Sequence, residues 1–220
     1  MFNLYSINMN IIRQPFKYRN YGTVYWLIGI NILVYAVMQI FGANFRNTLI
    51  IRMAMIPLAV TNGWVWTFIT YMFLHGSISH ILFNMLGLFI FGIHVEKQMG
   101  SREFLLYYLM TGILAGIFSF GVYYVTRNYW VALMGASGAL FAVQLAYAVF
   151  FPNSIIYIWG ILPLRAPVMV LGFTALELVF SFTGRSSGVA HLTHLAGFGF
   201  GWLYFLLRFG VNPWRRLTGR

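Results

Sequence analysis

Six long apolar segments limit what this chain can fold into. They lie at about residues 24–42, 68–93, 103–125, 132–151, 159–181 and 189–209. A helix needs about 20 apolar residues to cross the hydrocarbon core of a bilayer, and each segment is close to or above that length. Only 8% of the residues are charged, whereas soluble globular domains carry about a quarter. The sequence therefore predicts an all-α membrane protein, a bundle of six transmembrane helices.

The basic residues indicate how these helices are oriented. With both termini in the cytoplasm, ten basic residues fall on the cytoplasmic side: Arg13, Lys17, Arg19, Lys97, Arg102, Arg165, Arg208, Arg215, Arg216 and Arg220. Four fall on the outer side: Arg46, Arg52, Arg127 and Arg185. This asymmetry follows the positive-inside rule. We attribute the net charge of +11 to attraction for anionic membrane lipids, and we expect no nucleic-acid partner.

The chain divides into a basic cytoplasmic arm at 1–23, a six-helix domain at 24–210 and a basic cytoplasmic tail at 211–220. No small-residue cleavage site follows the first apolar run promptly, so we expect the arm to stay attached. The link from Gly42 to Thr67 is the longest, and we expect it to be ordered and partly interfacial. Pro163 and Pro167 predict that the region from Phe151 to Arg165 lies partly in a re-entrant or interfacial turn, so that the fifth helix begins later than hydropathy suggests.

Three of the predicted spans carry polar residues at a similar depth. In this topology the second, fourth and sixth spans all enter the membrane from the outer side. His75 and His80 fall in the first third of the second span, Ser137 lies early in the fourth, and His194 lies early in the sixth. Polar residues of this kind are costly in lipid and usually face an interior cavity. We therefore expect them to form one site, a little below the outer surface.

Ser137 and His194 have the residue types of a nucleophile and its base. A lone serine in a membrane helix commonly bonds back to its own helix. Here, however, Gly135 and Gly138 leave room around the hydroxyl for another helix or a substrate. Gly197 follows His194 at helical spacing, on a face that can press against the fourth span. A neutral imidazole can then accept the serine proton without a standing buried charge.

The acidic residues favour a Ser–His dyad over a triad. The chain has no aspartate, and only Glu177 could reach the required depth. Nothing in the sequence places Glu177 beside His194. His80 and Asn84 are four residues apart, so they share a helix face, and both can donate hydrogen bonds to an oxyanion.

Other readings of the polar residues remain open. His191 and His194 are spaced to chelate zinc, but no carboxylate or cysteine evidently joins them, so we expect no metal and no cofactor. His75 and His191 are expected nearer the surface; His75 either bonds within the outer loop or lines a water path. A transporter usually shows acidic coupling residues or paired broken helices, whereas Glu177 stands alone.

Three motifs resemble those of the rhomboid family of intramembrane serine proteases. HGSISHILFN at 75–84 is similar to the family's second-span motif, and GASG at 135–138 is similar to its nucleophile motif. HLAG at 194–197, followed by Gly201, is similar to its sixth-span motif. The resemblance covers nearly the whole chain, and its strength lies in the order and matching depth of the three motifs.

The resemblance implies a mechanism and a substrate class. Ser137 would be the nucleophile and His194 the general base, with His80, Asn84 and backbone N–H groups at Ala136 and Ser137 as the oxyanion hole. Substrates would be single-span membrane proteins, cut near the outer end of their helix. That helix must open first, because its carbonyls are held in its own hydrogen bonds. We expect such a protein in a bacterial inner membrane.

Three positions depart from the family's pattern. Trp66 is followed by Thr67 where many members have arginine, and Thr193 replaces a small alanine before the histidine. Phe141 replaces a tyrosine four residues after the serine, which keeps an aromatic face and loses the hydroxyl. No reacting group is lost. The alternative is a catalytically silent relative that binds membrane-protein clients, but such relatives tend to lose the serine or the histidine.

Overall fold

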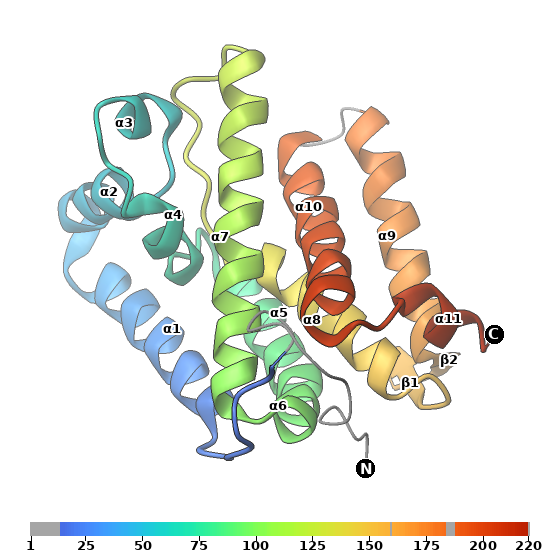
Figure 1. The fold of residues 1–220 in the computed structure, drawn as a ribbon. Coiled ribbons are helices and arrows are strands. Elements are labelled where there is room, and N and C mark those ends of the chain that lie inside the picture. The colour runs from blue at the N-terminus through green and yellow to red at the C-terminus, as the bar shows by residue number, and fades with distance from the viewer. Residues whose placement is uncertain (1–13, 159, 184–187, 220) are drawn as a thin grey trace.

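The computed structural model describes residues 14–158, 160–183 and 188–219 of a mostly helical chain (Figure 1). Its helices are α1 (Thr23–Ile40), α2 (Gly42–Met53), α3 (Pro57–Thr61), α4 (Thr67–Thr70), α5 (Ile78–Gly87), α6 (Ile93–Met99), α7 (Ser101–Val125), α8 (Ser137–Phe150), α9 (Ala166–Thr183), α10 (Gly188–Tyr204) and α11 (Pro213–Thr218). A 3-10 turn spans Tyr71–Phe73, and π-helical turns span Leu88–Gly92 and Phe205–Phe209. Arg13, Arg185 and Arg220, which we assigned to sides of the membrane, lie outside the described residues.

Three helical segments are long and apolar enough to cross a bilayer: Thr23–Ile40, Ile78–Met99 and Ser101–Val125. Two shorter apolar helices cover Ser137–Phe150 and Ala166–Ser181. Many large apolar side chains point outward, among them Trp26, Leu33 and Phe89. Large exposed apolar surfaces are unusual in soluble monomers and are expected where lipid surrounds the protein. The protein is therefore an integral membrane protein with apolar helical spans.

The second span begins later than predicted. Its helix starts at Ile78, not near 68, because Ser77 has an extended backbone and its Oγ accepts the N–H of His80 at 3.1 Å. A side-chain oxygen in this position caps a helix N-terminus. His75 consequently lies in the loop before α5, and the expectation that it sits within the span is wrong.

The prediction of an all-α chain is wrong in one detail. Strands β1 (Ile155–Ile158) and β2 (Leu162–Arg165) form an antiparallel hairpin, with Ile155 opposite Arg165. Pro163 lies within β2. The interior of a helix would not tolerate a proline, which agrees with a strand at this position. The fifth helix, α9, starts at Ala166, which confirms that it begins later than hydropathy suggests.

The link between the first two spans is ordered, as predicted, and it is tied to the segment before α8. It contains α2 and α3, and the Trp66 indole donates a hydrogen bond to the carbonyl of Arg52 at 3.0 Å. Met55 and Leu133 exchange backbone hydrogen bonds of 3.1 and 2.9 Å. The loop that leads into Ser137 is therefore held by the first link.

α8 begins at Ser137, and α10 packs against α8, against α7 and against α9. The α8–α10 contact depends on glycine. A Cβ on Gly197 would lie 1.9 Å from the carbonyl oxygen of Gly138, and one on Gly201 would lie 2.9 Å from the Cβ of Ala142. Small residues let membrane helices approach this closely. The two backbones are thereby brought close at the first turn of α8.

Two glutamates bind the helices together at sites away from Ser137. Glu96 accepts the backbone N–H groups of Thr23 and Val24, at 2.6 and 3.0 Å, and so caps α1. Glu103, fully buried, accepts two hydrogen bonds from Arg208, at 2.8 and 3.0 Å, and one from the Tyr204 hydroxyl. Both carboxylates are thus engaged in structural contacts.

Candidate active site

Ser137 and His194 are in hydrogen-bond contact. The Nε2 atom of His194 lies 2.7 Å from Ser137 Oγ, although the residues are 57 apart in sequence. Ser137 is the first residue of α8, and His194 comes from α10. The contact follows from the close approach of the two helices at Gly138 and Gly197. This is the arrangement that a serine needs if an imidazole is to accept its proton.

The ring of Phe141 fixes one face of His194. The two rings are stacked, with centroids 4.7 Å apart and an interplanar angle of 7°. Phe141 lies four residues after Ser137, so it presents its ring on the same face of α8. The aromatic face expected at this position is therefore present. It holds the imidazole in the plane that faces the serine.

Thr193 has a contact that alanine could not make. Its Oγ1 lies 2.6 Å from Ser119 Oγ on α7, and both residues are buried. The hydroxyl pair links α10 to α7 directly beside His194. This departure from the family's pattern therefore supports the position of the histidine.

His80 lies against the segment that leads into Ser137. A Cβ on Gly135 would be 2.6 Å from His80 Nε2, and Gly135 has φ +119°, which favours glycine. Asn84 is buried one turn further along α5, where its Nδ2 donates to the carbonyl of His80 at 2.8 Å. No hydrogen bond to Asn84 Oδ1 is found among the described residues.

His75 is buried against His80 in the loop before α5. It is 1% exposed, and its ring meets that of His80 edge-on at 4.9 Å. Within the described part of the chain neither ring nitrogen has a hydrogen-bond partner. The loop before α5 folds inward here, which places His75 in support of the His80 ring.

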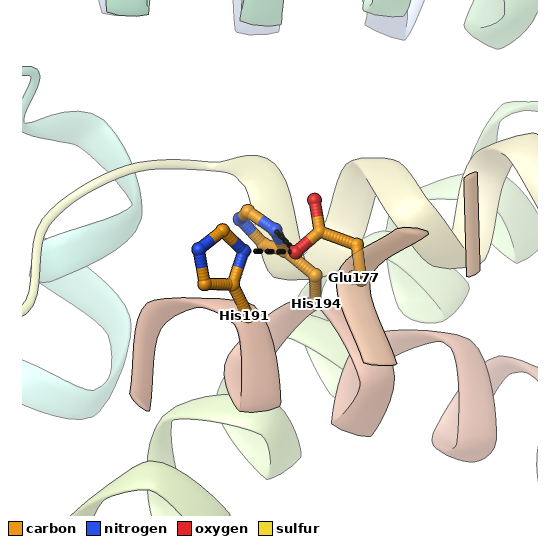
Figure 2. Close-up of side chains that lie close together, drawn as sticks. All are labelled: Glu177, His191 and His194. Carbon is orange, nitrogen blue, oxygen red and sulfur yellow. Dashed lines mark hydrogen bonds and ion pairs between the residues drawn. The ribbon is translucent and has the colours of Figure 1, made fainter. Parts of the chain in front are cut away.

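Glu177 is the site residue that the sequence reasoning missed. Its Oε2 atom lies 2.5 Å from His191 Nδ1 and 3.1 Å from His194 Nδ1 (Figure 2). All three side chains are largely buried, with exposed fractions of 17–20%. The expectation that nothing brings Glu177 beside His194 is therefore wrong. The available signal was a single acidic residue in an apolar span, which is rarely placed without a polar partner.

The same three residues are the group in the described chain that could hold a metal ion. Two histidines and a glutamate are a donor set that zinc accepts, so the absence of a carboxylate no longer argues against a metal. The spacing argues differently. Two ligands on one tetrahedral zinc, with bonds of about 2.0–2.1 Å, lie roughly 3.3 Å apart. The 2.5 Å between His191 and Glu177 fits a hydrogen bond instead.

Comparison with known proteins places this site in a family. The rhomboid domain matches residues 62–211, which is more than half of the chain. The chain belongs to the rhomboid family. It is 32% identical over 152 residues to YdcA of Bacillus subtilis (strain 168), an alignment that covers 68% of this chain and 70% of YdcA.

Two further relatives are named as rhomboid proteases. The chain is 27% identical over 188 residues to AarA of Providencia stuartii, covering 78% of this chain and 66% of AarA. It is 31% identical over 127 residues to GlpG of Salmonella choleraesuis (strain SC-B67), covering 56% of this chain and 42% of GlpG. The chain thus spans less than half of GlpG and about two thirds of AarA. The rhomboid match includes every residue of the site described above.

Proposed function

We propose that this protein is an intramembrane serine endopeptidase that cleaves single-span membrane proteins near the outer end of their transmembrane helix. The 2.7 Å contact between Ser137 Oγ and His194 Nε2 carries the proposal. It joins a nucleophile and a base within a bundle of apolar helices. The relatives named as rhomboid proteases support the same reading.

The reaction begins with attack of Ser137 Oγ on the scissile carbonyl carbon. The Oγ–C bond forms as the serine proton passes to His194 Nε2. His194 then gives this proton to the leaving amine when the C–N bond breaks, which leaves an ester on Ser137. Water, deprotonated by the same imidazole, hydrolyses the ester and restores the serine.

The negative charge of the tetrahedral intermediate needs hydrogen-bond donors. Ser137 is the first residue of α8, and the first N–H groups of a helix have no acceptor within it. Backbone N–H groups at Ala136 and Ser137, with His80 and Asn84, are the proposed donors. The positive end of the α8 dipole acts in the same direction.

The proposed topology has six spans, with α8, α9 and α10 joining the three long apolar segments, and both termini in the cytoplasm of a bacterial inner membrane. The domain at 24–210 would contain all reacting groups, flanked by the basic arm and tail. Ser137 and His194 would then open toward the outer side. The ten-to-four distribution of basic residues supports this orientation.

The test uses purified protein in liposomes with a model single-span substrate. We expect the wild type to cleave it, and Ser137→Ala and His194→Ala to lose nearly all cleavage. Equal cleavage by the wild type and Ser137→Ala would rule out the proposal. A fluorophosphonate should label Ser137 in the wild type and nothing in Ser137→Ala. A folded wild type that is not labelled would indicate the silent, client-binding alternative.

A further inference from the structure

We propose that Glu177 is a positioning residue that completes a Ser137–His194–Glu177 triad, with His191 holding its carboxylate in place. This inference rests on the proposed function, because it assigns a role within the same reaction. It replaces the dyad that the sequence favours.

The two nitrogens of the His194 ring face different partners. Nε2 lies 2.7 Å from Ser137 Oγ, and Nδ1 lies 3.1 Å from Glu177 Oε2. To act as a base toward the serine, Nε2 must carry the lone pair and Nδ1 the proton. A buried N–H at Nδ1 then needs an acceptor. The described structure gives this atom no hydrogen bond, and the Glu177 carboxylate is the acceptor that lies within ion-pair distance of it, at 3.1 Å.

Glu177 is placed for this role by its helix. It is the one acidic residue in α9, whose other side chains are apolar or carry only hydroxyl groups. A carboxylate in such a helix is costly unless donors satisfy it. Glu177 faces the histidines of α10 (Figure 2), and the other two glutamates are occupied elsewhere. It is therefore the carboxylate available to His194.

His191 orients the carboxylate. Its Nδ1 donates to Glu177 Oε2 at 2.5 Å, and this same oxygen faces His194. A carboxylate oxygen has two lone pairs and can accept from both rings. His191 lies about one helical turn before His194, so both imidazoles reach Glu177 from the same side of α10.

The carboxylate matters most when charge develops. As Ser137 bonds to the substrate carbon, its proton moves to Nε2, and His194 carries one positive charge with both nitrogens protonated. Glu177 stays ionised beside Nδ1 and stabilises this charge, which disappears when the proton passes to the leaving amine. The contribution therefore falls on the transition state and lowers kcat more than it changes KM when it is removed.

The experiment compares the wild type with Glu177→Gln in liposomes, with Glu103→Gln as a control for loss of a structural carboxylate. We expect Glu177→Gln to lower kcat at least about 10-fold with KM nearly unchanged, since the amide cannot balance the imidazolium. Its rate of labelling at Ser137 by a fluorophosphonate should fall in parallel. Glu103→Gln should lower Tm and leave kcat per folded molecule unchanged.

A second variant covers the case in which Glu177→Gln does not fold. Glu177→Asp keeps the charge but shortens the side chain, so we expect partial kcat with a Tm close to the wild type. Wild-type kcat in folded Glu177→Gln, or in either variant a loss that only matches the fall in folded fraction, would overturn the inference. So would loss of wild-type activity in EDTA that Zn²⁺ restores, which would make the cluster a metal site. Failure of the proposed function is distinct, because the wild type itself would then neither cleave nor be labelled.

Discussion

At the scale of single residues, the imidazole of His194 is constrained on three sides. Ser137 and Glu177 lie at its two nitrogens, and Phe141 covers one face at 4.7 Å. A ring held in this way spends little time in orientations from which it cannot accept a proton. The stack also places the negative face of the phenyl ring against an imidazole that becomes positive during the reaction.

We therefore expect Phe141→Ala to reduce kcat. Aromatic pairs contribute about 0.5–1.5 kcal/mol beyond the area they bury, which corresponds to roughly a 2- to 12-fold loss in rate. Phe141→Tyr keeps the stacked face and should retain most of the activity. Steady-state cleavage in liposomes measures both variants. Equal rates for Phe141→Ala and the wild type would show that the stack is not used in the reaction.

At the scale of helices, the site depends on how closely α8 and α10 approach. Gly197 has no room for a side chain, because its Cβ would lie 1.9 Å from the Gly138 carbonyl oxygen. Gly199, two residues later on the same helix, is exposed and has nothing within 4 Å of the position of a Cβ. The two glycines differ in their surroundings but share their helix.

This difference gives a matched prediction. Gly197→Ala must push α10 away from α8, so we expect a loss of several kcal/mol in stability, in the upper range seen for single substitutions, and loss of Ser137 labelling. Gly199→Ala should keep the wild-type labelling of Ser137 and should be slightly more stable than the wild type, because alanine has the higher helix propensity. Thermal unfolding in detergent and fluorophosphonate labelling would measure the pair. Retention of labelling by Gly197→Ala at wild-type Tm would contradict the described packing.

The helices also show where sequence reasoning stops. Hydropathy was sufficient to indicate a membrane protein with apolar helical spans, and the spacing of Ser137, His194 and His80 was sufficient to group these residues. The start of α5 depended on a capping hydroxyl at Ser77 within an apolar run, which hydropathy does not register. The partner of Glu177 depended on the rotation of α9 about its axis, which is set by packing against α10. One residue of difference in that register would turn the carboxylate about 100° away.

At the scale of the whole molecule, Glu103 connects parts of the chain that are distant in sequence. It lies at the start of α7 and accepts hydrogen bonds from Tyr204 at the end of α10, from Arg208 in the π-helical turn that follows, and from the backbone N–H of Phe16. Its side chain is fully buried, so its partners depend on it. This network joins the arm before α1 to the last long helix.

We expect Glu103→Ala to destabilise the fold by about 3–5 kcal/mol, because breaking one side of a buried ion pair leaves the other charge without compensation. Arg208→Ala should cost a comparable amount, and the double variant less than the sum, since the two side chains interact. Thermal unfolding of the wild type and the three variants gives the coupling free energy between Glu103 and Arg208. Additive losses would show that the pair contributes little to the stability of the bundle.

The shortness of α8 has a further consequence. Its 14 residues rise only about 21 Å, whereas the hydrocarbon core of a bilayer is about 30 Å thick. Eleven of the 14 residues are buried, so α8 is surrounded by neighbouring helices and not by lipid. A helix shorter than the hydrocarbon core is tolerated in this position. In the proposed orientation α8 extends from the cytoplasmic side of the membrane, and Ser137 lies at its outer end, so the length of α8 fixes the depth of Ser137. The number of residues in α8, more than any side chain, would then set how far below the outer surface a peptide bond is hydrolysed.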